Sequence, residues 1–210
     1  GCAGGGDLVA SYKYTEEAVG AVQVARDIAL TGLKGGHSGI DIILGLGNAN
    51  KLIARFLRTA IRDFDARIVQ INAGTARNAI PRESFATIVL PEGKVSGFEA
   101  ALAAFASEVK DEIGAIEPNF AIRATDAAVP AKAMSAKDSA AFNNACVGAP
   151  NGVQAMSTSV EGVVETSINL AIIKLADGAA DVTLSARSSI NSARDAMREV
   201  ATAVFENIGA

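Results

Sequence analysis

The sequence predicts an α+β fold in which an antiparallel sheet carries helices on one face. Half of the 210 residues are apolar, which is enough to build a substantial core. Two segments have the apolar spacing of long amphipathic helices, and short runs typical of strands flank each of them. Over residues 21–127 these elements follow the order β-α-β-β-α-β, which is the order of a ferredoxin-like unit.

The elements of this first unit follow from their residue patterns. Residues 22–33 are predicted to form a strand, because apolar residues partly alternate along them. A helix is clearest over residues 49–61, where Ile53, Phe56 and Leu57 share one face. Four basic residues lie on its other side and are expected to face solvent, namely Lys51, Arg55, Arg58 and Arg62. The remaining predicted elements are strands over residues 66–72, 84–90 and 119–125 and a helix over residues 95–113.

Residues 128–210 repeat the theme less clearly and are interpreted as a second, related α/β unit. The predicted elements are a helix over residues 131–147, strands over 152–157, 162–175 and 180–187, and a closing helix over 192–208. Asp177 and Gly178 form a predicted hairpin turn. This set could either extend the first sheet or duplicate the first unit.

The chain begins with a glycine-rich lead-in, residues 1–20, which could contribute an edge strand. Because the chain also lacks an initiator methionine, we interpret residues 1–210 as a single domain excised from a larger protein. The lead-in, residues 21–127 and residues 128–210 are its three expected parts.

Composition excludes several classes of function. A net charge of −4 and a pI near 5.1 argue against a nucleic-acid-binding protein, which usually presents a basic surface. No apolar run approaches the ~18 residues of a membrane span, and no secretory signal pattern occurs. Cys2 and Cys146 are too few for a disulfide framework. We therefore expect a cytoplasmic protein that binds neither nucleic acid nor membrane.

The only histidine lies in the string Thr31-Gly32-Leu33-Lys34-Gly35-Gly36-His37-Ser38-Gly39. Glycines permit tight turns and close approach of other groups, so His37 is expected on a strand-to-helix turn with its ring presented outward. An imidazole there can donate a hydrogen bond to developing negative charge or act as an acid or base. The local pattern equally permits a solvated loop histidine beside glycines that serve only the turn.

The sequence lacks the complete catalytic sets of common enzymes. A hydrolytic zinc site needs about three converging ligands, and one histidine without HxD or HExxH spacing cannot supply the usual set. The serine-nucleophile string GxSxG is absent, and residues 32–39 fit neither the dinucleotide-binding nor the P-loop pattern. We expect the chain alone to bind no cofactor and to be inactive.

Several strings together resemble one known family. They are Gly1-Cys2-Ala3-Gly4-Gly5, the histidine string with Gly47-Asn48-Ala49-Asn50-Lys51, Arg77-Asn78-Ala79-Ile80-Pro81-Arg82-Glu83, Pro150-Asn151-Gly152-Val153 and Gly162-Val163-Val164-Glu165-Thr166-Ser167. They are similar to the lid domain of the di-zinc metallopeptidases, the superfamily of aminoacylases, carnosinases and succinyl-diaminopimelate desuccinylases. The resemblance implies the substrate-orienting lid of a cytosolic dipeptidase that cleaves unblocked dipeptides, of the Xaa-His type. It places two zinc ions in a separate catalytic domain.

The resemblance also implies roles for three residues. His37 matches the lid histidine that hydrogen-bonds the scissile carbonyl oxygen. Asn78 matches an asparagine that contacts substrate, and its alternative role is that of a turn residue. The third residue is an arginine that grips the substrate carboxylate. By the spacing of shorter-lid relatives it would fall near Val89 in this chain, so Arg187 is the better match. The alternative for Arg187 is a surface arginine at a strand end.

The implied partners are a dipeptide substrate, the catalytic domain of the same protein and, in a homodimer, a second copy of the chain. Shorter-lid relatives dimerise through the lid and borrow the histidine from the partner. Because His37 and Asn78 lie in the first half here and Arg187 in the second, His37 could instead act in cis. The alternative from a different class is a non-catalytic ferredoxin-like interaction or regulatory module.

Overall fold

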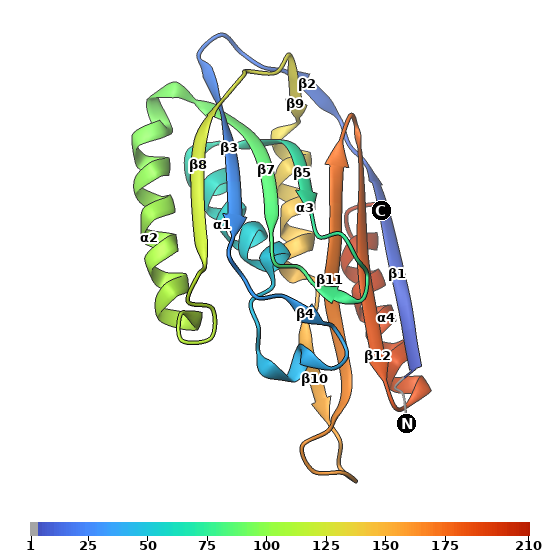
Figure 1. Ribbon diagram of the computed structural model, residues 1–210. Coiled ribbons are helices and arrows are strands. Elements are labelled where there is room, and N and C mark those ends of the chain that lie inside the picture. The colour runs from blue at the N-terminus through green and yellow to red at the C-terminus, as the bar shows by residue number, and fades with distance from the viewer. Residues whose placement is uncertain (1–3) are drawn as a thin grey trace.

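The computed structural model describes residues 4–210, so Cys2 and the start of the first string lie outside the described residues. The main element is an antiparallel sheet with the strand order β1-β12-β11-β5-β7-β3-β8, and β10 also pairs with β11 (Figure 1). Helices pack on one face of it, which confirms the predicted α+β class. No helix in residues 4–210 combines the length and the apolar character that a membrane span requires.

The first half supplies one side of the sheet. Its strand order is β8-β3-β7-β5, in which the first and third strands of the unit lie in the centre. This is the arrangement expected from β-α-β-β-α-β connectivity with antiparallel pairing. The elements are β3 (Gln23–Thr31), α1 (Ala49–Phe64), β5 (Arg67–Ala73), β7 (Ser84–Pro91), the 3₁₀ turn η2 (Glu92–Lys94), α2 (Val95–Ile113) and β8 (Ala121–Ala127).

The second half extends this sheet. Ile173 of β11 pairs with Ala73 of β5, and β12 continues the sheet beyond β11. The lead-in then adds β1 (Gly4–Lys13) along the free edge of β12, so it is an edge strand. Asp177 and Gly178 turn between β11 and β12 with φ angles of 52° and 82°. The elements of this half are α3 (Ala136–Gly148), β10 (Gly152–Met156), β11 (Val164–Ala176), β12 (Ala179–Ser188) and α4 (Asn191–Glu206).

The helix predicted from residue 131 begins later, at Ala136. The preceding residues form a short strand, β9 (Lys132–Met134), which pairs with β2 (Glu16–Ala18) from the lead-in. Ser135 lies between β9 and α3. Its backbone is extended, and its hydroxyl accepts from the backbone N–H of Asp138 at 3.0 Å. This side-chain cap fixes the first turn of α3.

One continuous core lies between the sheet and the helices (Figure 1). Each helix contributes a buried phenylalanine to this layer, namely Phe56, Phe98, Phe142 and Phe205. Burying each ring contributes about 2–3 kcal/mol. Because the same cluster includes residues from β3 and from β11, the two halves are stabilised together.

Lys51 departs from the expected solvent-facing row of α1. Its Nζ donates to the carbonyl oxygens of Cys146, Val147 and Ala149 at 3.1, 2.6 and 2.7 Å. These carbonyls end α3, where a cation complements the helix dipole. Burial lowers the pKa of Lys51 below its ordinary value. The other three basic residues of the row are exposed, as expected.

Candidate functional site

His37 lies in a loop that connects β3 to α1, and we name residues 35–46 the histidine loop. The loop contains a two-residue strand, β4 (Gly36–His37), and a 3₁₀ turn, η1 (Asp41–Leu44). β4 pairs with β6 (Ala79–Ile80), which places His37 opposite Ala79. The histidine therefore sits beside the Asn78 segment instead of leading directly into a helix.

Hydrogen bonds fix the orientation of the imidazole. Its Nδ1 accepts from the backbone N–H groups of Gly39 and Ile40, both at 3.2 Å. In the neutral ring, an accepting Nδ1 leaves the proton on Nε2. The backbone N–H of His37 donates to Oδ2 of Asp41 at 2.7 Å. The half-buried ring thus offers an Nε2–H donor for an oxygen that develops negative charge.

Asn78 occupies an exposed turn immediately before β6. Its carbonyl oxygen accepts from the backbone N–H of Ser38 at 2.9 Å, which ties the turn to the histidine loop. On the other side, Nδ2 of Asn169 donates to the carbonyl of Ala79 at 2.8 Å. The backbone of Asn78 is therefore held in place, while its exposed side-chain amide can both donate and accept.

Arg187 lies near the end of β12, on the sheet face away from the helices. It is half-buried, and its Nε is buried without a hydrogen-bond partner among residues 4–210. Within the same residues no carboxylate forms an ion pair with it. An uncompensated guanidinium suits a bidentate interaction with a carboxylate.

Two cavities bring the three residues together. One, of about 410 Å³, is lined by His37 and Arg187 together with Ile40, Ile43 and residues 162–165. The other, of about 230 Å³, is lined by Asn78 and again by Arg187. Because Arg187 borders both, residues predicted from three separate segments meet at one end of the sheet.

A larger cavity, of about 580 Å³, lies elsewhere, between α1 and α3, and none of these three residues lines it. Its arginines already have partners within the domain. Arg62 pairs with Asp63 at 2.6 Å, and Arg67 donates to Gln23 at 2.9 Å. Chemistry and geometry therefore favour the smaller cavities at the histidine loop.

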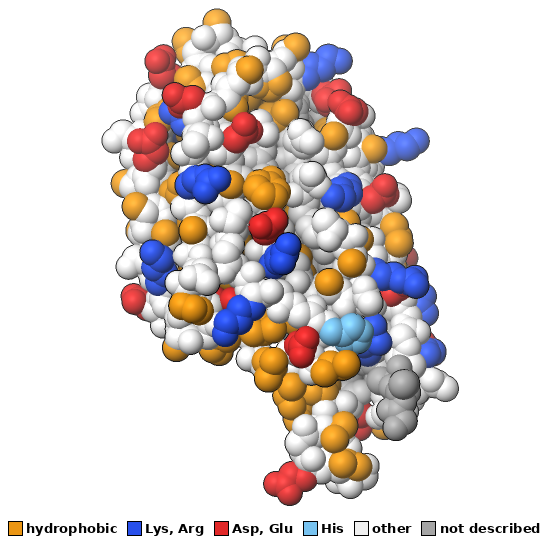
Figure 2. All heavy atoms as spheres, in the orientation of Figure 1, with side chains coloured by type: hydrophobic (Ala, Val, Ile, Leu, Met, Phe, Trp, Pro, Cys, Tyr) orange, Lys and Arg blue, Asp and Glu red, His pale blue; other side chains and the backbone are white. Residues whose placement is uncertain are grey.

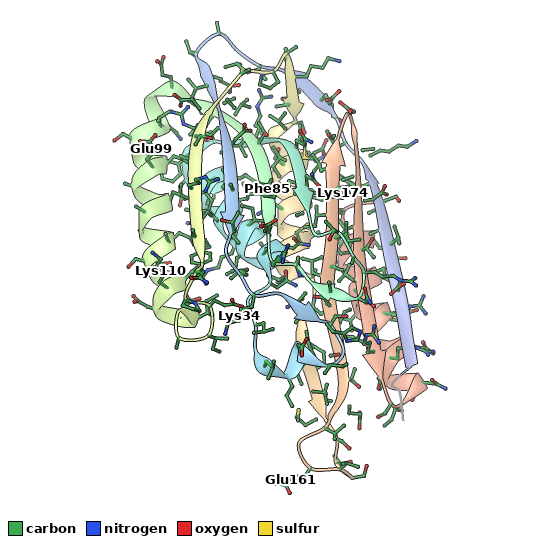
Figure 3. All side chains as sticks on the ribbon, in the orientation of Figure 1. Lys34, Phe85, Glu99, Lys110, Glu161 and Lys174 are labelled. Atoms are coloured by element: carbon green, nitrogen blue, oxygen red, sulfur yellow. The ribbon has the colours of Figure 1, made fainter. Side chains whose placement is uncertain are left out.

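The surface around the histidine loop is apolar and exposed. Figure 2 shows apolar side chains gathered beside the histidine and along the projecting β10–β11 hairpin, whose tip is marked by Glu161 in Figure 3. Ile40 exposes 75% of its surface. The other exposed members are Ile43, Leu44, Met156, Val160 and Val163. An apolar surface of this kind is typical of an interaction site.

A buried asparagine cluster that the sequence analysis missed supports this end of the sheet. β5 and β10 pair with different parts of the same edge of β11, and Leu170 lies between them. Its carbonyl accepts from Nδ2 of Asn48 and of Asn50, both at 3.2 Å, and its N–H donates to Asn151 at 2.9 Å. The available sequence signal was Asn169, a polar residue inside an apolar strand.

Within residues 4–210, no group of three or more histidine, cysteine, aspartate or glutamate side chains is placed to hold a metal ion. The residues that the structure describes therefore do not fit a zinc site. What this chain can supply is binding, orientation and hydrogen-bond donation.

Comparison with known proteins indicates the class of protein that this chain resembles. Residues 28–117, less than half of the chain, match the family described as "Peptidase dimerisation domain". The chain is 40% identical over 195 residues to the cytosol non-specific dipeptidase of Escherichia coli (strain K12), which is 93% of this chain and 40% of that protein. The crystal structure of aminoacylhistidine dipeptidase from Vibrio alginolyticus superposes with a TM-score of 0.96 at 39% identity, over 99% of this chain and 42% of that one.

The chain is thus similar to the dimerisation, or lid, domain of peptidases. In particular, it corresponds to the lid domain of the cytosol non-specific (aminoacylhistidine) dipeptidases. It spans about two fifths of the length of both relatives.

Proposed function

We propose that residues 1–210 form a single lid domain that orients unblocked dipeptides, of the Xaa-His type, in a zinc-dependent cytoplasmic dipeptidase. One observation carries the proposal: His37, Asn78 and Arg187, from three distant segments, border adjoining cavities at one end of the sheet. Two dipeptidases that are about 40% identical along nearly the whole chain support the assignment of the reaction.

In this proposal, His37 stabilises charge that develops during cleavage. Its Nε2–H donates to the scissile carbonyl oxygen as that oxygen becomes negative. The two Nδ1 hydrogen bonds hold the ring in the required tautomer before substrate arrives. A preorganised donor of this type lowers the barrier by about 2.7–4 kcal/mol.

Arg187 and Asn78 position the substrate. The guanidinium of Arg187, which forms no ion pair within residues 4–210, binds the free C-terminal carboxylate. The side-chain amide of Asn78 hydrogen-bonds the peptide. Because His37 and Arg187 line the same cavity of one chain, we propose that the histidine acts in cis.

The remaining parts of the enzyme lie outside this chain. The catalytic domain and its two zinc ions are the proposed partners of the site, and the exposed apolar surface around the histidine loop suits contact with another protein surface. A homodimer would then use a different part of the domain. Residues 1–20, 21–127 and 128–210 remain the proposed lead-in and two units.

The test is His37→Ala in the complete enzyme. We expect kcat to fall by roughly 10²–10³, because one oxyanion donor is lost. Zinc content should be unchanged, since His37 is not proposed as a ligand. Lys34→Ala, an exposed change just outside the histidine loop, is the matched control and should keep most of the activity. Loss of zinc from the His37 variant, or an unaltered kcat, contradicts the role.

The second candidate is a non-catalytic interaction or regulatory module. The exposed apolar surface favours it, because interaction modules also present such surfaces. An unchanged kcat in His37→Ala, together with lost partner binding when Ile40 is changed to Asp, would support this alternative.

A further inference from the structure

Glu117 is a buried carboxylate in the connection between α2 and β8, and it contacts the two residues that flank the histidine loop. Only 1% of its surface is exposed. Its Oε2 accepts from the backbone N–H of Lys34 at 2.8 Å, and its Oε1 accepts from that of Gly47 at 2.9 Å. Figure 3 shows Lys34 between this connection and the histidine loop. One side chain thus joins the two ends of a compact loop.

Glu117 has no cation partner within the part of the chain that the structure describes. A buried carboxylate without a cation is unfavourable unless hydrogen bonds satisfy it. Here one backbone N–H is bonded to each oxygen, and hydrogen bonds to charged acceptors are the strong ones. The carboxylate can accept from both N–H groups only while Lys34 and Gly47 lie close together, so the two hydrogen bonds favour that arrangement of the loop ends.

The surrounding packing keeps the two ends close. A Cβ on Gly32 would lie 1.9 Å from the carbonyl oxygen of Asn119, and a Cβ on Gly47 would lie 2.9 Å from Leu33. Glycine at both positions lets the backbone approach the Glu117 connection. Neither contact is made by His37 itself, so these contacts act on the ends of the loop and add to the local hydrogen bonds of the imidazole.

We propose that Glu117 is a positioning residue that fixes the histidine loop and thereby aims the Nε2–H of His37. This inference rests on the proposed function, in which His37 donates to the scissile carbonyl oxygen. Without the carboxylate, the two N–H groups lose their common acceptor and the loop moves relative to Arg187. A displacement of about 1 Å is enough to cost up to 10²-fold in rate.

The first test uses nuclear magnetic resonance on the 210-residue chain, whose single histidine gives one set of imidazole signals. In Glu117→Gln the amide keeps one acceptor oxygen but turns an NH₂ group toward the other backbone N–H. We therefore expect the His37 ring signals to shift or broaden and the amide exchange of Lys34 or of Gly47 to quicken at least tenfold. Amides of β3 and β7 should keep their wild-type exchange. Glu108→Gln, an exposed change on α2, is the matched control and should leave all of these unchanged.

Glu117→Asp is a second variant, which keeps the test usable if Glu117→Gln does not fold. It keeps the charge but is one methylene shorter, so it should loosen one end of the loop and give a smaller shift of the same signals. A folded Glu117→Gln with wild-type histidine signals would overturn the proposal. Global unfolding of both variants would also overturn it, because the carboxylate would then support the whole domain instead of the loop.

Kinetics of the complete enzyme distinguish the positioning role of Glu117 from the proposed function of His37. Glu117→Gln should lower kcat by about tenfold or more while KM and zinc content stay within twofold. If His37→Ala leaves kcat unchanged, the proposed function fails, yet the resonance experiment still decides whether Glu117 holds the loop. If His37→Ala is inactive but Glu117→Gln has normal kcat, only the positioning role is refuted.

Discussion

His37 and Arg187 come from opposite halves of the chain and meet above the backbone of Gly39. A Cβ built on that glycine would lie 3.2 Å from Cε1 of His37 and 2.9 Å from Cδ of Arg187. Both distances are shorter than ordinary van der Waals contact with a Cβ. The absent side chain at residue 39 is therefore what allows the imidazole and the guanidinium stem to share one cavity.

Gly39→Ala should consequently damage the site more than the fold. We expect kcat/KM of the complete enzyme to fall by about 10- to 100-fold, because either the ring or the guanidinium must move. The free energy of unfolding of the domain should change by less than about 1 kcal/mol, since the loop is at the surface. Steady-state kinetics and urea unfolding measure the two quantities.

Gly93→Ala is the control for that change. No heavy atom lies within 4 Å of the position its Cβ would occupy, and the residue is in η2, away from the histidine loop. It should leave kcat/KM at the wild-type value. Equal activity of the two variants would show that the space above Gly39 does not matter.

Arg187→Met tests the carboxylate contact. We expect KM for dipeptides to rise by about tenfold or more, because hydrogen bonds between charged groups contribute ~1.5–3 kcal/mol. A dipeptide amide, which has no carboxylate, should be a poor substrate for the wild type and should lose little more in the variant. The informative quantity is the difference between the effect of Arg187→Met on the dipeptide and its effect on the dipeptide amide.

Arg123→Met provides the comparison, since it removes an exposed arginine from β8 at the opposite edge of the sheet. Its kinetics on the acid and the amide should match those of the wild type. If Arg187→Met harms both substrates to the same extent, Arg187 is a structural residue at a strand end and not a carboxylate ligand.

Asp138 should make stability depend on pH. Burial alone would raise its pKa, but hydrogen bonds from Thr15, Tyr12 and Ser135 hold the pKa below its ordinary value. The ionised form therefore favours folding, and its contribution is complete above the ordinary pKa of 3.8 and is lost as pH falls through the lowered value. Asp138→Asn should cost about 1–2 kcal/mol at pH 7 and clearly less near pH 3, as measured by urea unfolding.

Asp111→Asn is the control for Asp138, because Asp111 is an exposed residue of α2. Its variant should unfold like the wild type at both pH values. A constant difference between Asp138→Asn and the wild type from pH 7 to pH 3 would show that the charge of this carboxylate is not responsible.

The sequence by itself determined the elements and the class of fold. Apolar residues at helical spacing define α1 and α2 because one face of each must be buried, and this is a local property of the chain. The Asp177-Gly178 turn was equally predictable, since both residues tolerate positive φ. The strings around His37 and Asn78 indicated the family before any coordinates, and the comparisons confirm it.

Only the tertiary structure decided which distant residues meet. The pairing of β1 with β12, the inward turn of Lys51 and the two hydrogen bonds of Glu117 all join segments that are far apart in sequence. Strand pairing and buried hydrogen bonds depend on which backbone groups still lack partners in the whole fold. A local sequence pattern does not contain this information. The common cavity of His37 and Arg187 has the same origin, because it exists only once β12 has joined the sheet that carries the histidine loop.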